Sequence, residues 1–534
     1  MIQTEVLIIG CGIAGATTAL RLARNPKRRI TVITRAPDPH ESNTRYAQGG
    51  IIGRGAGDSA ESLTGDILAA GAGVSSPNAA RILAEEGPSL LKEILVEAAG
   101  IQFDRGADGQ WSWGQEAAHS HRRILHVGDG TGRAIIEGLI AALRRCPNVT
   151  IETNVTAVDL ITFPHHSRDP LAAYQPIVCH GAYVFDRSQC AVQRCLSAIT
   201  VLANGGLGRI YRNTTNPPGA RGDGLAMAHR AGARIINAEY VQFHPTALAA
   251  PGAEGFLISE ALRGEGGILL TPEGQAFMAD YSPEWKDLAP RDVAARAIHH
   301  VMESRGYSHV LLDIASRMPA DAVRARFPNI YAACLRAGID ITREPIPVVP
   351  AAHYFCGGVA VDGWGHSTID NLYAVGEVSC TGVHGANRLA STSLLEGVVW
   401  GSRAAQHVEQ RLDADTPRVP SLDETPPWDE SGLTAEADPA LIQGDMQTIQ
   451  NIMWHYVGLV RSADRLSRAI RELRHLWNEI ETFYRTTRLS DGLIGLRNAV
   501  EVALIVAQAA RHNRHSRGCH YRTDSASVEG DRLI

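Results

Sequence analysis

The feature that most constrains the fold is a glycine-rich turn between a strand and a helix at the start of the chain. Residues 5–10, EVLIIG, form a short apolar run typical of a buried strand, and residues 11–25 have apolar side chains at helical spacing. Gly10, Gly12 and Gly15 form G-x-G-x-x-G at the junction. Glycines there let the backbone approach a pyrophosphate at a helix N-terminus, whose partial positive charge favours phosphate. In this context the pattern predicts a Rossmann-like dinucleotide-binding domain.

The end of the second predicted strand departs from the usual form of this domain. RITVIT, residues 29–34, is followed by Arg35, and the first acid beyond it is Asp38. Dinucleotide-binding domains commonly carry an acid at that place, which holds the adenosine ribose. We therefore expect ribose binding to differ in detail here.

Later segments predict that this domain is interrupted and then resumed. Residues 149–203 contain short strand-like runs that end in VLANGG, an apolar strand followed by glycines, and Asp223 precedes a helix that it could cap. From about residue 236 the pattern is mixed α+β, and the dinucleotide-type pattern returns near residue 350. A segment rich in Pro, Asp and Glu follows at 412–438, and apolar residues then recur every three or four positions.

The predicted class is α/β, with a Rossmann-like domain interrupted by an α+β capping domain and followed by a C-terminal helical bundle. The predicted boundaries are 1–235 and 346–411 for the dinucleotide-binding domain, 236–345 for the cap, 412–438 for a linker and 439–534 for the helical domain. The stretch from Arg517 to the end is predicted to be a loosely ordered tail.

Size and composition narrow the function. A chain of 534 residues exceeds one ordinary core, and a net charge of −6 argues against a general binder of nucleic acid. We see no apolar run near the ~20 residues that a membrane helix needs, and the N-terminus enters a strand at once without the features of a signal peptide. The nine cysteines show no CxxC pair or metal-binding spacing. We expect a cytoplasmic protein with reduced thiols and no metal site.

Several blocks in order along the chain identify a resemblance. They include IIGCGIAG, TRYAQGG, EAAHSHRRILHVGDGTG, GDGLAMAHRAGA, QFHPTAL, SEALRGEGG, APRDVAARAI, PAAHYFCGG and NLYAVGEVSCTGVHGANRLASTSLLEG. Together they cover nearly the whole chain, which resembles the succinate dehydrogenase and fumarate reductase flavoprotein family. The dinucleotide is therefore expected to be FAD.

The resemblance implies a set of cofactor-binding residues. With the glycines of the turn, they are Gly10, Cys11, Gly12, Ile13, Ala14, Gly15, Arg35, Asn43, Thr44, Arg45, Tyr46, Ala47, Gln48, Gly49, Gly50, Asp223, Glu377, Ser391, Ser393 and Leu394. Ser391 and Ser393 open a helix whose free N–H groups would stabilise negative charge on the flavin. Respiratory members of the family attach FAD through a histidine a few residues before QGG, and this chain has Asn43 at about that place. We therefore expect non-covalent FAD.

The resemblance also implies the residues that bind and transform a four-carbon dicarboxylate. Arg388 and His353 would hold one carboxylate, and His244 and Ser259 the other, so that a C–H bond points at the flavin. Arg291 matches the proton-transferring arginine of the family, with Glu260 and Arg263 as its relay. A pKa above ~12 makes arginine a poor base unless such a relay assists it. The structural alternative for Arg291 is a helix-capping ion pair with Asp292 or a neighbour.

Glu116 bears on which dicarboxylate is used. It stands where the family members that oxidise L-aspartate carry a glutamate directed at the substrate amine; the structural alternative is a surface glutamate. The resemblance thus implies oxidation of L-aspartate to iminoaspartate with oxygen or fumarate as acceptor, as the first step of NAD synthesis through quinolinate, with quinolinate synthase as a possible partner. The alternatives are a soluble fumarate reductase or succinate dehydrogenase flavoprotein, and a non-catalytic FAD-binding subunit.

Overall fold

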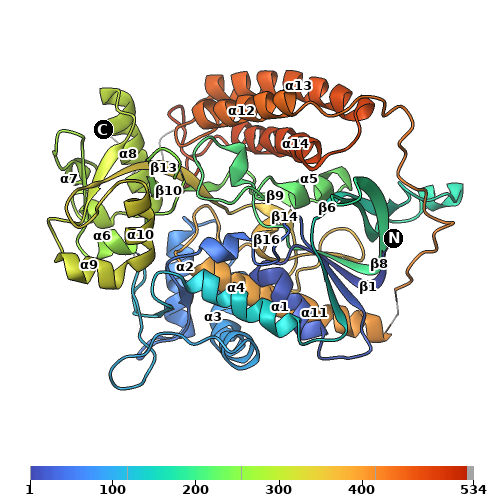
Figure 1. Ribbon diagram of the computed structural model, residues 1–534, viewed down its shortest axis with the longest axis horizontal. Coiled ribbons are helices and arrows are strands. Elements are labelled where there is room, and N and C mark those ends of the chain that lie inside the picture. The colour runs from blue at the N-terminus through green and yellow to red at the C-terminus, as the bar shows by residue number, and fades with distance from the viewer. Residues whose placement is uncertain (1, 117, 254, 415–416, 526–534) are drawn as a thin grey trace.

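The computed structural model describes residues 2–116, 118–253, 255–414 and 417–525 (Figure 1). A seven-stranded sheet forms its centre, in the order β5-β2-β1-β8-β7-β6, with β15 paired to β8. The pairs of β1 with β2 and β8, of β2 with β5 and of β8 with β15 are parallel, whereas β6, β7 and β8 pair antiparallel. The strands of this sheet are β1 (Ile2–Ile9), β2 (Ile30–Ile33), β5 (Val149–Glu152), β6 (Val155–Phe163), β7 (Val178–Asp186), β8 (Ala191–Leu202) and β15 (Leu372–Ala374).

The turn after β1 has the geometry that the glycine pattern predicts. Gly10 has φ +117°, and a Cβ atom there would lie 2.2 Å from the carbonyl oxygen of Ala203 at the end of β8. A Cβ atom at Gly15 would lie 2.1 Å from the carbonyl oxygen of Gly10. Because only glycine fits at both places, the first turn of α1 (Ile13–Leu22) packs directly on the end of the sheet.

The two faces of the sheet belong to two different cores. Val6 and Ile8 of β1 pack into one core with α1 and the helices on that face, and Leu7 packs with the other. Figure 1 shows the first group of helices below the sheet and the C-terminal helices above it. The helices of the first face are α1, α2 (Ala60–Ala70), α3 (Pro77–Leu91), α4 (Thr131–Leu143) and α11 (Thr392–Ala414).

A second, antiparallel sheet forms one end of the molecule, with the order β10-β13-β12-β11. It has its own core, to which α8 and α10 contribute. Its strands are β10 (Val241–Leu248), β11 (Ile268–Leu270), β12 (Val310–Asp313) and β13 (Ile346–Phe355). The helices beside it are α6 (Ala261–Gly264), α7 (Met278–Tyr281), α8 (Arg291–Arg305), α9 (Ala320–Arg326) and α10 (Pro328–Arg336). Two smaller sheets complete the strands. One pairs β3 (Ile51–Ile52) with β4 (Ile124–Leu125), and the other has the order β16 (Ser379–Cys380), β14 (Gly358–Ala360), β9 (Ile235–Ile236).

Three helices, α12 (Pro439–Tyr456), α13 (Ala463–Thr486) and α14 (Asp491–His512), cross the upper face of the sheet over α5 (Asp223–Arg230). The expectation that no apolar run reaches membrane-spanning length was wrong for α14, which is long and apolar enough by composition. However, 72% of its most apolar window is buried inside the molecule, as in a core helix. The physical reason is that α14 packs against both the sheet side and its neighbours, so it is apolar over most of its circumference.

The two segments expected to be loose differ from that expectation. The part of the predicted linker at 417–438 lies along β7 and β8, where Tyr183 donates to the carbonyl of Pro426 at 2.9 Å and stacks edge-on against Trp428. The predicted tail is tied down at Cys519, whose N–H donates to the carbonyl of Ala386 at 2.9 Å. Residues 526–534 of that tail lie outside the described residues. The two sheets and the helical C-terminal region confirm the predicted class, and the domain boundaries stay a prediction.

Candidate active site

A cavity of about 270 Å³ lies where the carboxyl ends of β1 and β2 meet the second sheet and the start of α11. Most predicted site residues line it. They are Gly10, Cys11, Gly12, Ile13, Ala14, Arg35, Asn43, Thr44, Tyr46, Ala47, Gln48, Gly49, Gly50, Glu116, Asp223, His244, Ser259, Glu260, Arg291, His353, Glu377, Arg388, Ser391, Ser393 and Leu394. Gly15, Arg45 and Arg263 do not line it: Gly15 packs beneath the turn, Arg45 pairs with Asp38 at 3.3 Å, and Arg263 lies behind Glu260.

The half of the cavity beside α1 offers hydrogen-bond acceptors without protein partners. The side-chain oxygens of Asn43, Gln48 and Asn204 are buried there and accept no hydrogen bond within the described structure. The N-terminus of α1 has no side-chain cap at Gly12. The first N–H of α1, that of Ile13, donates to Oγ1 of Thr44 at 3.0 Å, and the positive end of the helix still favours an anion. Buried acceptors without donors are costly unless a ligand supplies the donors. Ribityl and ribose hydroxyls and flavin N–H are such donors, and a pyrophosphate is such an anion, so the residues present fit FAD.

Asn43 occupies the predicted place of the attachment residue, and its amide is engaged with protein. Its Nδ2 donates to Oε2 of Glu377 at 2.8 Å, and Oε1 of Glu377 accepts from the backbone N–H of Phe355 at 3.0 Å. Burial raises the pKa of Glu377 to about 7, and these two hydrogen bonds act against that rise. An amide cannot form the covalent link that an imidazole forms, so FAD is held non-covalently.

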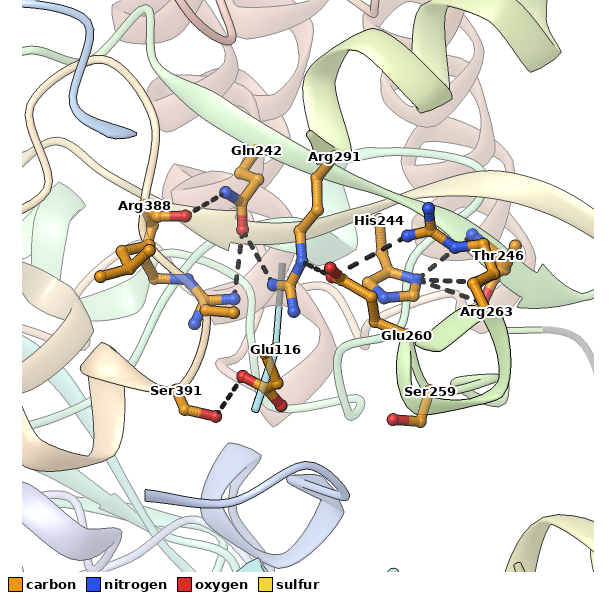
Figure 2. A network of polar contacts seen from close by, with 12 residues as sticks. Glu116, Gln242, His244, Thr246, Ser259, Glu260, Arg263, Arg291, Arg388 and Ser391 are labelled. Atoms are coloured by element: carbon orange, nitrogen blue, oxygen red, sulfur yellow. Dashed lines mark hydrogen bonds and ion pairs between the residues drawn. The ribbon is translucent and has the colours of Figure 1, made fainter. Parts of the chain in front are cut away.

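The other half of the cavity is dominated by buried cations (Figure 2). Arg388 follows the loop after β16 and is 5% exposed. Its Nη1 donates to Oγ of Ser393 at 3.2 Å, its Nη2 donates to Oε1 of Gln242 at 3.1 Å, and its guanidinium lies 4.5 Å from the ring centre of Tyr354. These contacts come from three separate segments and fix the plane of the guanidinium. A fixed fork of this kind suits a carboxylate.

Arg291 begins α8 and points into the same space. Its Nε donates to Oε2 of Glu260 at 2.7 Å, and Nη2 of Arg263 lies 3.8 Å from the same oxygen. Asp292 pairs with Arg296 at 3.1 Å, so the ion pair of Arg291 is with Glu260 and not with Asp292. Burial alone would raise the pKa of Glu260, but Arg291 and Arg263 outweigh it and hold the pKa below its ordinary value. The three side chains form a continuous polar chain from the cavity to the interior of the cap.

His244 and His353 lie side by side, with ring centres 5.1 Å apart. Nδ1 of His244 lies 3.2 Å from both the backbone nitrogen and the carbonyl oxygen of Thr246, and Nδ1 of His353 lies 2.8 Å from the hydroxyl of Thr215. Burial holds the pKa of both imidazoles well below the ordinary value, and nearby arginines lower it further. Both rings are therefore neutral hydrogen-bonding groups at neutral pH. Ser259 lines the cavity on the same side.

Glu116 reaches the cavity from the segment before β4 and is not a surface glutamate. It is half-buried, and its Oε2 accepts from the hydroxyl of Ser391 at 2.7 Å. A Cβ atom at Gly49 would lie 2.4 Å from its Oε1, so the glycine makes room for the carboxylate. Burial raises the pKa of Glu116, against the effect of Arg291. The carboxylate thus lies near the arginines, and among the described residues it has no ion-pair partner.

The substrate end of the cavity carries an excess of positive charge, which favours an anionic ligand. Arg263, Arg291 and Arg388 converge on this region; Glu260 pairs with Arg263 and Arg291, and Arg388 has no ion-pair partner among the described residues. Buried charge that lacks a partner is costly, so the empty space between Arg388, Arg291 and the two histidines is complementary to a dianion.

Sequence reasoning missed Gln242, which joins the two cavity arginines. Its Oε1 accepts from Arg388 at 3.1 Å and lies 3.4 Å from Nη1 of Arg291, and its Nε2 donates to the carbonyl of Arg388 at 2.9 Å. The signal was present, because Gln242 and His244 are two residues apart on β10 and such residues share a face. Thr215 was also missed, and no local pattern marks it.

Comparisons with known proteins agree with this geometry. The profile of the family described as FAD binding domain matches residues 5–394, and that described as Fumarate reductase flavoprotein C-term matches residues 446–532. The chain is 43% identical to L-aspartate oxidase of Yersinia pestis over 524 residues, 98% of this chain and 96% of that protein. It is 42% identical to the chloroplastic L-aspartate oxidase of Arabidopsis thaliana over 99% of this chain and 82% of that protein.

Solved structures with the same fold include a variant of E. coli quinol fumarate reductase FrdA. That chain superposes with a TM-score of 0.88 at 27% identity, covering 100% of this chain and 93% of that one. Mycobacterium smegmatis Sdh1 superposes with a TM-score of 0.81 at 30% identity, covering 98% and 89%.

Proposed function

The chain belongs to the succinate dehydrogenase and fumarate reductase flavoprotein family, and from this we infer that it oxidises L-aspartate to iminoaspartate with FAD. Oxygen, which yields hydrogen peroxide, or fumarate then takes the electrons. The observation that carries this inference is the carboxylate of Glu116, held by Ser391 beside the buried Arg388 and the partly buried Arg291. An amino dicarboxylate offers two anionic ends for the cations and a nitrogen for the carboxylate.

Binding follows from the two ends of the cavity. Arg388 and His353 hold one carboxylate of the substrate, and His244 and Ser259 hold the other. Two fixed ends leave the substrate little freedom, so its Cα–H bond is oriented before reaction, which is how positioning lowers a barrier. When bound, FAD supplies the acceptor for the hydride that leaves Cα.

Proton transfer is assigned to Arg291. Its Nε is committed to Glu260, which holds the guanidinium in one orientation at the cavity wall. Glu260 and Arg263 continue the polar chain away from the cavity, so a proton exchanged at Arg291 can be passed on without opening the site to water.

Glu116 is assigned to substrate choice. Succinate and L-aspartate differ by the amino group, and a half-buried carboxylate that faces a methylene group instead of an amine keeps the hydrogen bond from Ser391 but gains no cationic partner. Sites that lose a hydrogen-bonding partner in this way reject the poorer substrate. The fumarate reductase relatives favour a second activity, the reduction of fumarate in the same cavity.

The decisive experiment is anaerobic reduction of the bound flavin, followed by its visible absorbance. L-aspartate should bleach the flavin, and D-aspartate and succinate should bleach it far more slowly. Reduction by succinate but not by L-aspartate would overturn the assignment in favour of a succinate dehydrogenase, and reduction by no dicarboxylate would favour a non-catalytic FAD-binding subunit.

The same proposal covers the biological setting. Iminoaspartate hydrolyses readily, so a consuming enzyme is expected nearby, and in this family of reactions that enzyme is quinolinate synthase, on the route to NAD. We place the protein in the cytoplasm on the basis of its sequence, whereas its plant relatives are named as chloroplastic. Faster quinolinate formation from L-aspartate when the two enzymes are mixed than when they are separated by a membrane would support direct hand-over.

A further inference from the structure

One face of α14, in the C-terminal helical region, lies against the wall of the cofactor cavity. Asp491, Gly495, Asn498 and Val502 are spaced four, three and four residues apart, which places them on one side of a helix. Each contacts the segment 221–223 or a residue beside it. Figure 1 shows α14 directly above α5, whose first residue is Asp223.

Asp491 holds a residue of the cavity wall by an ion pair. Its Oδ2 accepts from Nη1 of Arg35 at 2.7 Å, and its Oδ1 accepts from the hydroxyl of Thr156 at 2.8 Å; both partners line the cavity. Arg35 follows β2, the place from which Rossmann-type domains hold the adenosine ribose with an acid. Here an arginine stands at that place, and the acid that orients it comes from a segment 456 residues away.

The same helix holds a second wall residue, Asp223, through two contacts. Arg221 lies between the two acids, with Nη2 donating to Asp223 Oδ2 at 2.8 Å and Nη1 donating to the carbonyl of Asp491 at 2.9 Å. Asn498 donates to the other oxygen of Asp223 at 2.9 Å. A Cβ atom at Gly495 would lie 2.4 Å from Nη1 of Arg221, so the glycine lets the buried guanidinium lie flat on the helix.

We propose that Asp491 is a positioning residue for FAD binding, which aims Arg35 and, through Arg221, Asp223 at the adenosine end of the cofactor. The C-terminal helices then complete the FAD site from behind, although they do not line it. This proposal depends on FAD as the cofactor and not on which dicarboxylate is oxidised.

The test is the affinity of the apo protein for FAD, measured by quenching of flavin fluorescence. Asp491→Asn should raise the Kd for FAD about tenfold, because a charge-assisted pair and the orientation of Arg35 are both lost. The matched control is Glu501→Gln on the same helix, where the carboxylate pairs with Arg230 and His229 away from the cavity. Its Kd should change less than about twofold.

Gly495→Ala separates positioning from helix stability. Alanine is the better helix former, yet its Cβ would displace Arg221, so FAD affinity should fall while the helix itself is not weakened. This variant also keeps the test decisive if Asp491→Asn does not fold.

A double-mutant cycle with Arg35→Gln locates the effect. If Asp491 acts largely through Arg35, adding Asp491→Asn to Arg35→Gln should raise the Kd less than it does alone. ADP, which carries only the adenosine end, should compete with FAD more weakly in Asp491→Asn than in the parent. The proposal would be overturned if the Kd for FAD were unchanged in both Asp491→Asn and Gly495→Ala. It would also be overturned if Glu501→Gln weakened FAD binding as much as Asp491→Asn does. A third contrary outcome is full additivity of Asp491→Asn with Arg35→Gln together with undiminished competition by ADP. Loss of FAD affinity with no oxidation of L-aspartate in the parent would sustain it and refute only the proposed substrate.

Discussion

The two ends of the cavity bind by different means. The cofactor end is made of a glycine turn, a helix N-terminus and neutral acceptors such as Asn43 and Asn204, with Arg35 and Asp223 in its wall. The substrate end is made of charged side chains, with Arg291 and Arg388 fixed by Glu260 and Gln242. A large ligand held by many weak contacts loses little binding free energy when one contact is removed, whereas a small ligand held by a few charged contacts loses much of it. Substitutions should therefore have graded effects at the first end and steep effects at the second.

The difference also reflects how each end is built along the chain. The cofactor end includes two short stretches, 10–14 and 43–50, to which separate segments add Arg35, Asp223 and Glu377. The substrate end takes Gln242, Glu260 and Arg291 from three segments of the predicted cap, and Arg388 from the loop before α11, which reaches Gln242 where that loop packs against the cap. Such a concentration of charge is tolerated because each arginine also donates hydrogen bonds to the protein on the side away from the cavity.

The steepest loss is expected for Arg291→Leu. The variant should bind FAD normally, because Arg291 lies at the substrate end, but kcat for L-aspartate should fall by about 10³-fold through loss of proton transfer. Steady-state rates, together with the flavin absorbance of the purified variant, measure both effects.

The control is Arg296→Leu, one turn further along α8, where the arginine pairs with Asp292 and does not line the cofactor cavity. Its kcat should stay within a few fold of the parent. Normal turnover in Arg291→Leu would show that Arg291 does not transfer the proton. If the purified variant were colourless, it would have lost FAD, and the two ends of the cavity would not act separately.

Arg388→Leu should act mainly on substrate affinity. The loss of a bidentate carboxylate contact should raise KM for L-aspartate by about 10²-fold, and Arg388→Lys should recover only part of it, since a lysine cannot reproduce the fork. Initial rates over a range of L-aspartate concentrations give KM and kcat separately. A fall in kcat with unchanged KM would show that Arg388 does not hold the ground-state carboxylate.

The cofactor end was the part of the site easiest to predict, for a physical reason. A strand, a tight turn and a helix N-terminus are local structures, so Gly10, Gly12 and Gly15 together with the strand and helix that flank them indicate a phosphate site. Even there, Arg45 turned away from the cavity to pair with Asp38, because the side-chain direction depends on neighbours that a motif does not contain.

The substrate end and the backing of the wall needed the structure. Gln242 joins two arginines that follow it by 49 and 146 residues, and Asp491 reaches Arg35 across 456. Contacts of such separation depend on domain packing and leave no periodic signal in the sequence. The apolar α14 shows the converse, because its composition suits a membrane and only its packing shows that most of it is buried in a core.

A smaller effect, on selectivity, is expected for Glu116→Gln. The amide keeps the size of the carboxylate but loses its charge toward the substrate amine, so kcat/KM for L-aspartate should fall by about tenfold. Fumarate reduction by the same variant should change much less, because fumarate has no amine. Rates with both substrates, taken on one preparation, measure the ratio. An equal loss with both substrates would assign Glu116 to the general shape of the site.

The smallest effect is expected at the cofactor end, from Glu377 in the apo protein. Burial raises its pKa from the ordinary 4.5 to about 7, so the folded state favours the protonated carboxyl. Its contribution to stability is full below pH ~4.5 and is lost as the pH rises through about 7, at most about 3 kcal/mol. Glu377→Gln keeps a neutral group at every pH, so its thermal midpoint should gain on the parent by a few degrees between pH 5 and 8. Glu501→Gln should show no such gain, because His229 and Arg230 lower the pKa of Glu501 against the effect of burial. If the thermal midpoints of Glu377→Gln and the parent changed in parallel with pH, burial would not be raising the pKa of Glu377.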